Sequence, residues 1–440
     1  MRFSKYFLTI IFLACSILAH AQKDTVLTLQ QCLDIAIKNN LTVNQDAIAA
    51  AQARVGFVQA KENLIPSITG GADRELTSGR ALNPVTNSYI TQSVTSDNYN
   101  VNGTVTLFNG LALQAAIKQT SLAYQSGKMA FQAAKDLVTV NVITNYLQVL
   151  DAIEILGQTK SQLDLAKENV DIAGIKEKSG ANPTASTYSD FEGAYASSQV
   201  AVVQAQNSLD AAKLSLFQLM NIPYNKGAEL QALNAQDLTG EYGVNADEVY
   251  NTALQQLAQV KAATLMRQSA EKGVTYAKGL LYPQLVLEGG LATNYSNLNA
   301  SSYSDQFKNN YGTYLELGLN IPIFTNHIKK NAITLAKLNL ENYQYIEDNT
   351  KIQLKQSVEL AYYNMIGAYN RYQALDNEVK AYTESYRVSK IRLDAGVITS
   401  DLFLIAKNNM DAANLNFISA RYDYFIYSKI LDYYQGKLSR

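Results

Sequence analysis

The chain has 440 residues, with 37 Lys and Arg against 38 Asp and Glu and a formal net charge of −1. This balance, without a basic cluster, excludes a nucleic-acid partner, because such proteins concentrate positive charge on one face. Two cysteines and two histidines are too few for a disulfide framework, and we expect neither a metal centre nor another cofactor. No nucleophile or paired-carboxylate motif stands out, so the protein is predicted not to be an enzyme.

Residues 1–21 have the composition of a secretory signal peptide. A basic start precedes the apolar run FLTIIFLACSILA, and the small residues of AHA at 19–21 provide a cleavage site. The run is too short to span a bilayer, so we expect an exported chain that begins at Gln22. A second interpretation makes Cys15 a lipid-modified cysteine, although the three residues before it fit a lipoprotein site poorly.

The remainder of the chain is duplicated. The stretch AKENLIPSI at 60–68 is matched by AKGLLYPQL at 277–285, with Ala, Lys, Leu and Pro at corresponding places. Further pairs lie 216 residues apart, namely Phe108 and Phe324, Tyr146 and Tyr362, and Gly180 and Gly396. A repeat of this length is not a solenoid unit. The sequence therefore predicts two structural repeats, residues 22–244 and 245–440.

Each half is predicted to contain the same elements in the same order. An Ala- and Gln-rich helix over 28–63 ends before Pro66, because the residue before a proline is disfavoured in helix. A strand pair over 66–108, a long helix over 110–176 and a return helix over 186–221 follow, with a polar loop at 77–97 inside the strand pair. The second half gives a helix from Asn245, a strand pair over 283–324, a long helix over 326–392 and a return helix over 400–435.

The strands alternate between apolar and polar residues. In YLELGLNIPIF one face carries only aliphatic side chains, those of Leu315, Leu317, Leu319, Ile321 and Ile323. Alternation over about ten residues is what a membrane-spanning barrel strand requires, with one face toward lipid and one toward water. An antiparallel sheet on a soluble core gives the same period and remains an alternative.

The long helices are unusual in length and polarity. Residues 110–176 contain no proline, and neither do residues 326–392. A continuous helix of that size would reach roughly 100 Å. Its narrow apolar stripes among Gln, Asn and Ser indicate helices packed side by side with one wetted face. Cys32 lies on an apolar stripe of the predicted opening helix and is expected to be buried. His327, the only histidine after residue 21, is expected to be structural.

Taken together, these parts resemble the TolC family of outer-membrane efflux proteins over Thr28–Gln435. The resemblance is carried by the opening LTLQQCLDIAIKNN, the junctions NLIPSITGG and LLYPQLVLEGG, and the turn IRLDAGVITSDLFLIAK. It implies a mainly α fold with a transmembrane β-barrel, in which a homotrimer forms a 12-stranded barrel continued by a periplasmic α-helical barrel.

The same resemblance implies a function and its sites. The protein would be the exit duct of a tripartite efflux pump or type I secretion system in the outer membrane of a Gram-negative bacterium. It would dock to a periplasmic adaptor and an inner-membrane transporter. The implied docking tip contains Gly180, Pro183, Thr184, Gly396 and Thr399, and the gate candidates are Lys176, Arg392, Asp394 and Asp401.

The chain departs from some of these relatives near the second turn. They place acidic residues in a cation-selecting ring where this chain has Leu402 and Ile405, so strong acid-ring selectivity is not expected here. A secreted, all-helical structural or filament-like protein without a transport role is the alternative function. The aliphatic face at 315–323 argues against that alternative, because a soluble hairpin has no use for an exposed row of aliphatic side chains.

Overall fold

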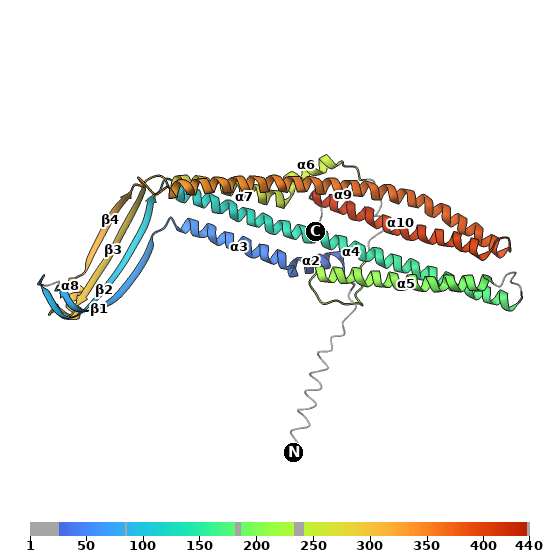
Figure 1. Cartoon of the computed structure of the whole chain (residues 1–440), viewed down its shortest axis with the longest axis horizontal. Coiled ribbons are helices and arrows are strands. Elements are labelled where there is room, and N and C mark those ends of the chain that lie inside the picture. Colours follow the sequence, from blue (N-terminus) through green and yellow to red (C-terminus); the bar gives the residue numbers. More distant parts are fainter. Residues whose placement is uncertain (1–25, 84–85, 181–185, 233–241, 438–440) are drawn as a thin grey trace, which may run out of the picture. The chain divides into compact units, whose positions relative to one another are not determined.

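A computed structural model describes residues 26–83, 86–180, 186–232 and 242–437 (Figure 1). The predicted signal peptide, Cys15, Pro183 and Thr184 lie outside these residues. The chain forms two compact units. We call residues 1–45, 132–257 and 351–440 the helical unit, and residues 46–131 and 258–350 the strand unit. Each unit takes segments from both halves of the sequence.

The fold is mainly helical and repeats in two halves. The first half contains α2 (Leu29–Asn39), α3 (Leu41–Glu62), β1 (Ser67–Leu82), β2 (Tyr89–Phe108), α4 (Ala112–Lys178) and α5 (Ser186–Leu219). The second half contains α6 (Ala246–Gln256), α7 (Ala258–Gly279), β3 (Gln284–Ser296), α8 (Tyr303–Asn309), β4 (Gly312–Asn320), α9 (Ile328–Asp394) and α10 (Ser400–Tyr434). Helices α4 and α9 are each 67 residues long. No helix in the described ranges has an apolar stretch that could cross a membrane.

The continuous opening helix predicted over 28–63 is wrong, because the chain leaves the helical conformation at Asn40. Asn40 has extended backbone angles, and its side-chain oxygen accepts a hydrogen bond from the Val43 N–H at 3.1 Å. The residue thus ends α2 and caps the start of α3. Leu257 makes the equivalent extended break between α6 and α7, 217 residues later.

The polar loop predicted at 77–97 is also wrong, because strand residues occupy most of that segment. β1 and β2 pair from Ser67 with Thr104 to Leu82 with Tyr89. Arg74 on β1 lies opposite Asp97 on β2, and its guanidinium contacts the Asp97 carboxylate at 2.6 Å. A strand is predicted from the alternation of apolar and polar residues. This segment has polar side chains on both faces, so the alternation is absent and the strand is not predicted.

The aliphatic row ends sooner than predicted. β4 stops at Asn320, opposite Gln284 at the start of β3, so Ile321 and Ile323 lie beyond the strand. Pro322 and Pro283 explain the shared limit, because a proline has no N–H to donate to the ladder. Leu315, Leu317 and Leu319 remain on one face of β4.

The four strands form one antiparallel sheet in the order β1-β2-β3-β4 (Figure 1). The β2–β3 pairing joins the two halves of the chain, with Val105 opposite Leu287 and Leu287 opposite Leu317. β1 and β4 each have a strand partner on only one side within the described residues. The sheet therefore ends in two open edges.

Left-handed residues mark both junctions where a strand passes into a long helix. Gly110 and Leu111 have φ values of 68° and 64°, and Asn326 and His327 have values of 49° and 62°. A Cβ atom on Gly110 would lie 2.3 Å from the Gly279 carbonyl oxygen, so this close approach requires glycine. His327 thus occupies a tight turn, where its ring meets that of Phe324 edge to face.

The core of the helical unit surrounds Tyr146 on α4. Its side chain is fully buried, and its hydroxyl donates to the Gln231 carbonyl at 2.7 Å. A parallel bridge between Leu27 and Leu230 lies beside it. Cys32 is also fully buried, as expected, and burial raises the pKa of its thiol to about 11.

Candidate functional site

The sheet has one aliphatic face. Side chains directly opposite each other in paired strands lie on the same face. Leu287 and Leu317 are such a pair, and Leu285 and Leu319 are another. Leu315, Leu317 and Leu319 are all more than half exposed. This row continues across β2 at Val105, opposite Leu287.

The opposite face of the sheet is polar. Glu288 and Glu316 lie directly across from each other, and Thr104 faces Glu288 from β2. Like charges in direct opposition are unfavourable unless water screens them. Both carboxylates are exposed in a single chain. The polar face is therefore built for contact with water.

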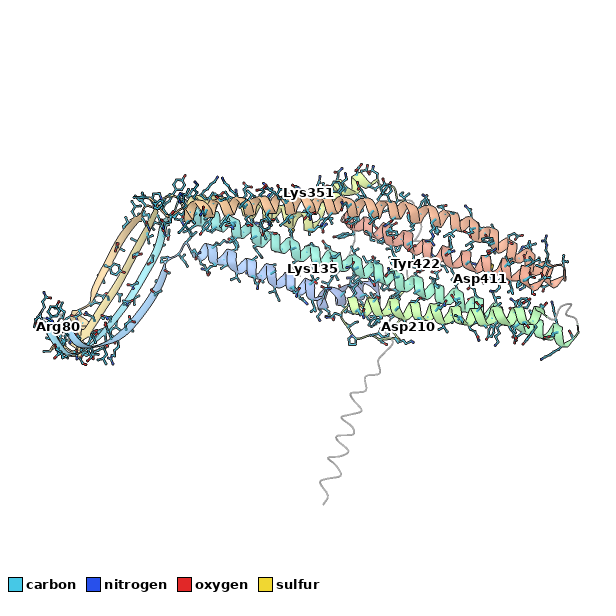
Figure 2. The ribbon with its side chains drawn as sticks, viewed as in Figure 1. Arg80, Lys135, Asp210, Lys351, Asp411 and Tyr422 are labelled. Atoms are coloured by element: carbon cyan, nitrogen blue, oxygen red, sulfur yellow. The ribbon has the colours of Figure 1, made fainter. Side chains whose placement is uncertain are left out.

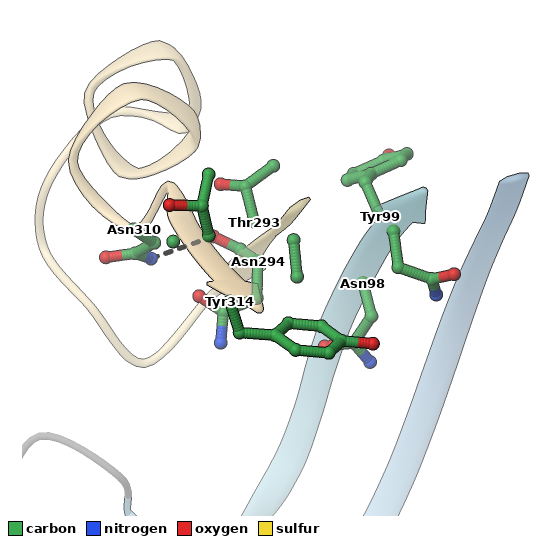
Figure 3. Close-up of a pocket in the computed structure, with 10 residues that line it drawn as sticks. Asn98, Tyr99, Thr293, Asn294, Asn310 and Tyr314 are labelled. Atoms are coloured by element: carbon green, nitrogen blue, oxygen red, sulfur yellow. Dashed lines mark hydrogen bonds between the residues drawn. The ribbon is translucent and has the colours of Figure 1, made fainter. Parts of the chain in front are cut away.

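Toward the end of the sheet near α8 the polar face is hollowed. A recess of about 450 Å³ is lined largely by asparagine and tyrosine side chains (Figure 3). Tyr314 crosses Gly290, where a Cβ would meet its ring at 2.7 Å, and its hydroxyl donates to the Asn102 side chain at 3.3 Å. Asn310 donates to the Asn294 carbonyl at 2.8 Å. The sequence alone does not predict this group, because its members come from three strands and a loop.

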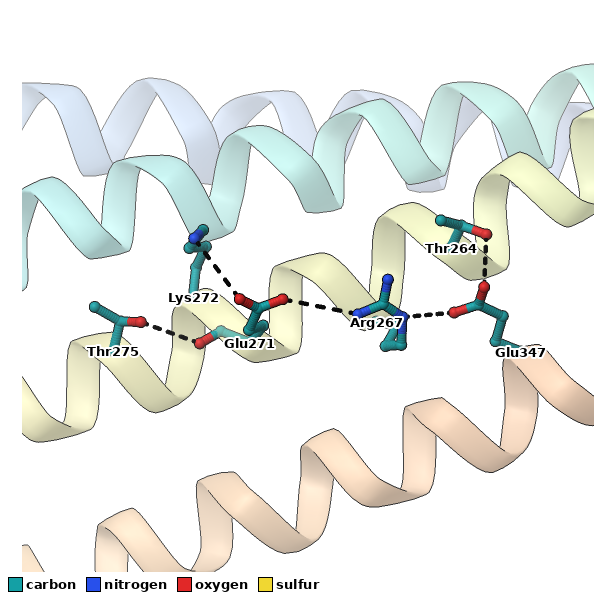
Figure 4. A network of polar contacts seen from close by, with 6 residues as sticks. All are labelled: Thr264, Arg267, Glu271, Lys272, Thr275 and Glu347. Carbon is teal, nitrogen blue, oxygen red and sulfur yellow. Dashed lines mark hydrogen bonds and ion pairs between the residues drawn. The ribbon is translucent and has the colours of Figure 1, made fainter.

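A polar network ties α7 to α9 within the strand unit (Figure 4). The Arg267 Nε donates to the Glu347 carboxylate at 2.6 Å, and the Thr264 hydroxyl donates to its other oxygen at 3.0 Å. The Glu347 side chain is only 8% exposed. Arg267 also lies 3.7 Å from Glu271. A carboxylate this deeply buried depends on its cation.

The two predicted turns join long and return helices. Gly180 and Gly396 have φ values of 67° and 70°, the left-handed conformation that glycine adopts without a steric penalty. At the second turn the Val397 N–H reaches the Arg392 carbonyl at 2.8 Å, and the Gly396 N–H reaches that of Leu393 at 3.0 Å. These two bonds form a Schellman motif, which satisfies carbonyls at the helix end.

Side chains from both halves pack together behind these turns. Phe191 on α5 meets Phe403 on α10 edge to face, with ring centres 6.1 Å apart. The Ser400 hydroxyl donates to the Asp190 carboxylate at 2.7 Å. Ala173 completes the buried cluster. The adjoining ends of α4, α5 and α10 thus pack together as one structural element, which we call the tip.

The gate candidates lie around the tip. Arg392 is in the last turn of α9 and Asp394 is its final residue, and both are exposed. Arg392 forms no ion pair with the described residues of its own chain. A hydrogen bond from the Thr399 side chain lowers the pKa of Asp401 in the first turn of α10. Lys176 lies in the last turn of α4.

Gly396→Val is expected to destabilise the tip by roughly 1–2 kcal/mol, because a β-branched residue is strained in the left-handed region. A Cβ there meets no atom within 4 Å, so the strain is confined to the backbone. The measurement is hydrogen exchange of the Val397 amide, which should become faster. Gly367→Val is the matched control, since Gly367 also has open space but lies within α9. Equal exchange in the two variants would contradict the expectation.

A charged cluster lies between α4 and α10. Asp151 and Glu154 belong to α4, and Arg421 on α10 forms an ion pair with Glu154. The Asp151 Oδ1 atom is buried and accepts no hydrogen bond from the described residues. Desolvation, followed by repulsion from Asp423 and Glu154, raises the pKa of Asp151 to about 6, although Arg421 opposes the shift. Tyr422, which is labelled in Figure 2, follows Arg421 on α10, and desolvation and then the charge of Glu154 raise its pKa to about 12.

Asp151→Asn is expected to stabilise the protein near neutral pH. The unfolded carboxyl has a pKa near 3.9, so the folded wild type loses stability as pH rises from about 4 to about 6. The variant lacks this loss, worth on the order of 1–2 kcal/mol after screening by solvent. Thermal melting at about pH 8 and about pH 4 should show a gain only at the higher pH. A gain of the same size at both values would refute the argument.

The four-stranded sheet has two open edges, one aliphatic face and one polar face, and long polar helices follow it in the chain. These are the parts expected in one subunit of a membrane channel. A profile of outer membrane efflux proteins matches residues 32–221 and 249–433, one match in each half. The chain belongs to the outer membrane efflux protein family. Members of this family are channels and not enzymes.

Solved structures of outer-membrane channels have the same fold. The outer membrane protein VceC of Vibrio cholerae has 14% sequence identity and a TM-score of 0.79, with 93% of this chain and 96% of that chain covered. The CmeC outer membrane channel of Campylobacter jejuni has 19% identity and a TM-score of 0.78, covering 93% and 86%. The open MtrE outer membrane channel of Neisseria gonorrhoeae has 18% identity and a TM-score of 0.77, covering 94% and 90%. No curated protein matches the sequence.

Proposed function

We propose that three copies of this chain form the exit duct of a tripartite efflux pump or type I secretion system. The observation that carries the proposal is the open four-stranded sheet with its aliphatic and polar faces. Unpaired strand edges are not tolerated in lipid, so a membrane-embedded sheet must close. Three copies complete a barrel of 12 strands by pairing β4 of one chain with β1 of the next.

The two faces then acquire distinct surroundings. Leu315, Leu317 and Leu319 face lipid, and Glu288 and Glu316 face the water-filled interior. The long helices α4 and α9 continue the conduit in the periplasm, as their polar surfaces favour. The protein is a passive conduit in the outer membrane of a Gram-negative bacterium, and its cargo is selected elsewhere.

Disulfide cross-linking tests the closure. Pairs of cysteines placed one on β1 and one on β4 are expected to give covalent species up to a trimer and no larger. The native Cys32 is buried and does not interfere. Variants with only one of the two cysteines are the controls and should not form a ladder. Polymers beyond the trimer, or a chain that remains monomeric in detergent, would rule out a closed three-chain barrel.

The tip is the proposed docking surface for a periplasmic adaptor, which links the duct to an inner-membrane transporter. Exposed aliphatic side chains surround both turns, and these are Ile175, Ile391, Val397, Leu402 and Ile405. Gly180 and Gly396 set the path of the chain there, and Thr399 precedes α10. Pro183 and Thr184 are part of the proposal by sequence alone. Gly180→Val and Gly396→Val should weaken adaptor capture but leave trimer formation intact.

Arg392 is proposed to latch the tip closed. Because it has no ion-pair partner in the described part of its own chain, it is available to Asp394 or Asp401 of a neighbouring chain. Each exposed pair contributes about 0–1 kcal/mol, so three copies form a weak latch that docking can open. Lys176 is the corresponding cation in the first half.

Arg392→Ala is therefore expected to raise single-channel conductance in planar bilayers, and high salt should partly reproduce the effect in the native protein. Lys390→Ala removes the same charge two residues away and is the matched control. If both variants conduct like the native channel, Arg392 acts only as a favourable cation at a helix C-terminus.

A further inference from the structure

Helix α8 is fastened to the aliphatic face of the sheet. The Tyr303 and Tyr99 hydroxyls form a hydrogen bond of 2.6 Å, and the rings of Phe307 and Tyr99 meet edge to face at 5.6 Å. The Thr293 hydroxyl donates to the Phe307 carbonyl at 2.7 Å. Since Tyr99 lies opposite Thr293 and Val101 lies opposite Leu291, these contacts share the face that carries the leucines.

The strand register gives the position of α8 along the sheet. Leu285, Leu287 and Leu291 lie on the aliphatic face of β3, and Thr293 follows Leu291 on that face. Counting from Leu285, Thr293 is the ninth residue. A barrel strand crosses a bilayer in about 9–11 residues. Helix α8 therefore lies where β3 would leave the membrane, at the end of the sheet opposite the long helices.

The segment around α8 is held together by the hydrogen bonds of one buried side chain. The Gln306 side chain is 2% exposed, and its amide donates to the carbonyls of Ser296, Asn299 and Ser301 at 3.1, 3.2 and 2.8 Å. Ser302 caps the helix by accepting from the Asp305 N–H at 3.1 Å. These bonds tie α8 to the loop before it and to the end of β3.

The side chains that hold α8 to the sheet remain partly exposed, and the exposed surface of this segment includes three aromatic residues. Tyr303, Phe307 and the following Tyr311 are 43%, 44% and 56% exposed, and Lys308 is exposed beside them. Aromatic side chains gather at membrane interfaces, where a ring contacts acyl chains and a polar tip contacts headgroups. A lysine at the same level can extend toward headgroup phosphates.

We propose that α8 is an interfacial anchor that inserts into the headgroup layer of the outer leaflet and fixes the depth of the sheet. This inference rests on the proposed membrane-embedded barrel. The surface of α8 lies on the same face of the sheet as Leu315, Leu317 and Leu319. The lipid that contacts these leucines would therefore also contact α8. The competing occupant is β1 of a neighbouring chain, which the barrel would bring near β4.

The absence of tryptophan from the chain makes a direct test available. Phe307→Trp gives a single fluorescent residue on α8, in a protein reconstituted with lipids brominated either near the headgroup or near the chain end. The emission is expected to shift to shorter wavelength and to be quenched mainly by bromines near the headgroup. If the variant does not insert, Tyr311→Trp carries the same expectation.

Two controls separate this inference from the proposed barrel. Leu317→Trp should be quenched mainly by bromines near the chain end, and Tyr345→Trp on α9 by neither lipid. A blue-shifted but unquenched signal from the Phe307→Trp variant would show that a neighbouring chain covers α8, and emission typical of water would show an uncovered surface. Either result overturns the anchor if Leu317→Trp is still quenched. Loss of quenching at Leu317→Trp as well would refute the barrel itself.

Discussion

Leu317→Arg is expected to prevent most chains from inserting as a folded sheet. Leu317 lies within the aliphatic row, opposite Leu287 and well over half exposed. An arginine near the bilayer midplane costs about 2–4 kcal/mol in a barrel strand. The proposed trimer would incur that cost three times. The measurement is folding into lipid vesicles, followed by urea titration of the inserted fraction.

Asn320→Arg is the control for this substitution. Asn320 belongs to the same strand, but its register places it on the polar face opposite Gln284. A cation there contacts water and should leave insertion nearly unchanged. If the two variants insert equally well, or equally poorly, the assignment of the faces to lipid and water is wrong.

Arg267→Ala should destabilise the strand unit by about 3 kcal/mol. Removing one member of a buried ion pair typically costs about 3–5 kcal/mol, and the lower value applies because the Arg267 side chain is 28% exposed. The change removes the cation at 2.6 Å from the Glu347 carboxylate, although the Thr264 hydroxyl stays in place. Denaturant or thermal unfolding in detergent measures the loss.

A double variant distinguishes the lost cation from lost packing. Arg267→Leu combined with Glu347→Leu removes both charges and keeps apolar volume between α7 and α9, so it should recover most of the stability. Glu271→Ala, which touches only the outer part of the network, should change stability by less than about 1 kcal/mol. A double variant as unstable as Arg267→Ala would show that the helix contact, and not the charge, matters.

The order of the helices and strands is predictable from the sequence, but the residues at which they begin and end are less so. Pro66 and Pro283 marked the ends of the opening helices, because a proline acts on its immediate neighbour. The break at Asn40 carried a weaker signal, since asparagine is tolerated within helices and its capping role depends on the conformation of one residue. Leu257 gave no signal at all. Its break follows from packing in the helical unit, where it is buried.

Some parts of the candidate site are predictable from the sequence and others are not. The left-handed turns at Gly180 and Gly396 were predictable, because glycine favours that conformation. The anchor helix was not, because its contacts join Tyr99 to Tyr303 and Phe307 across roughly 200 residues of sequence. The pairing of Arg267 with Glu347 likewise depends on which faces of α7 and α9 meet. Such contacts follow from the tertiary fold and leave no periodic pattern.

The duplication also has a consequence for the kinetics of assembly. Each chain contains two copies of the helix-strand-helix unit, so the proposed closed ring of three chains would contain six such units. Six separate half-length chains would have to lose translational and rotational freedom one by one, at an estimated cost of about 4–15 kcal/mol for each association. Covalent linkage replaces three of those encounters with intramolecular ones at high effective concentration. Formation of the proposed ring would thereby depend on a lower power of protein concentration.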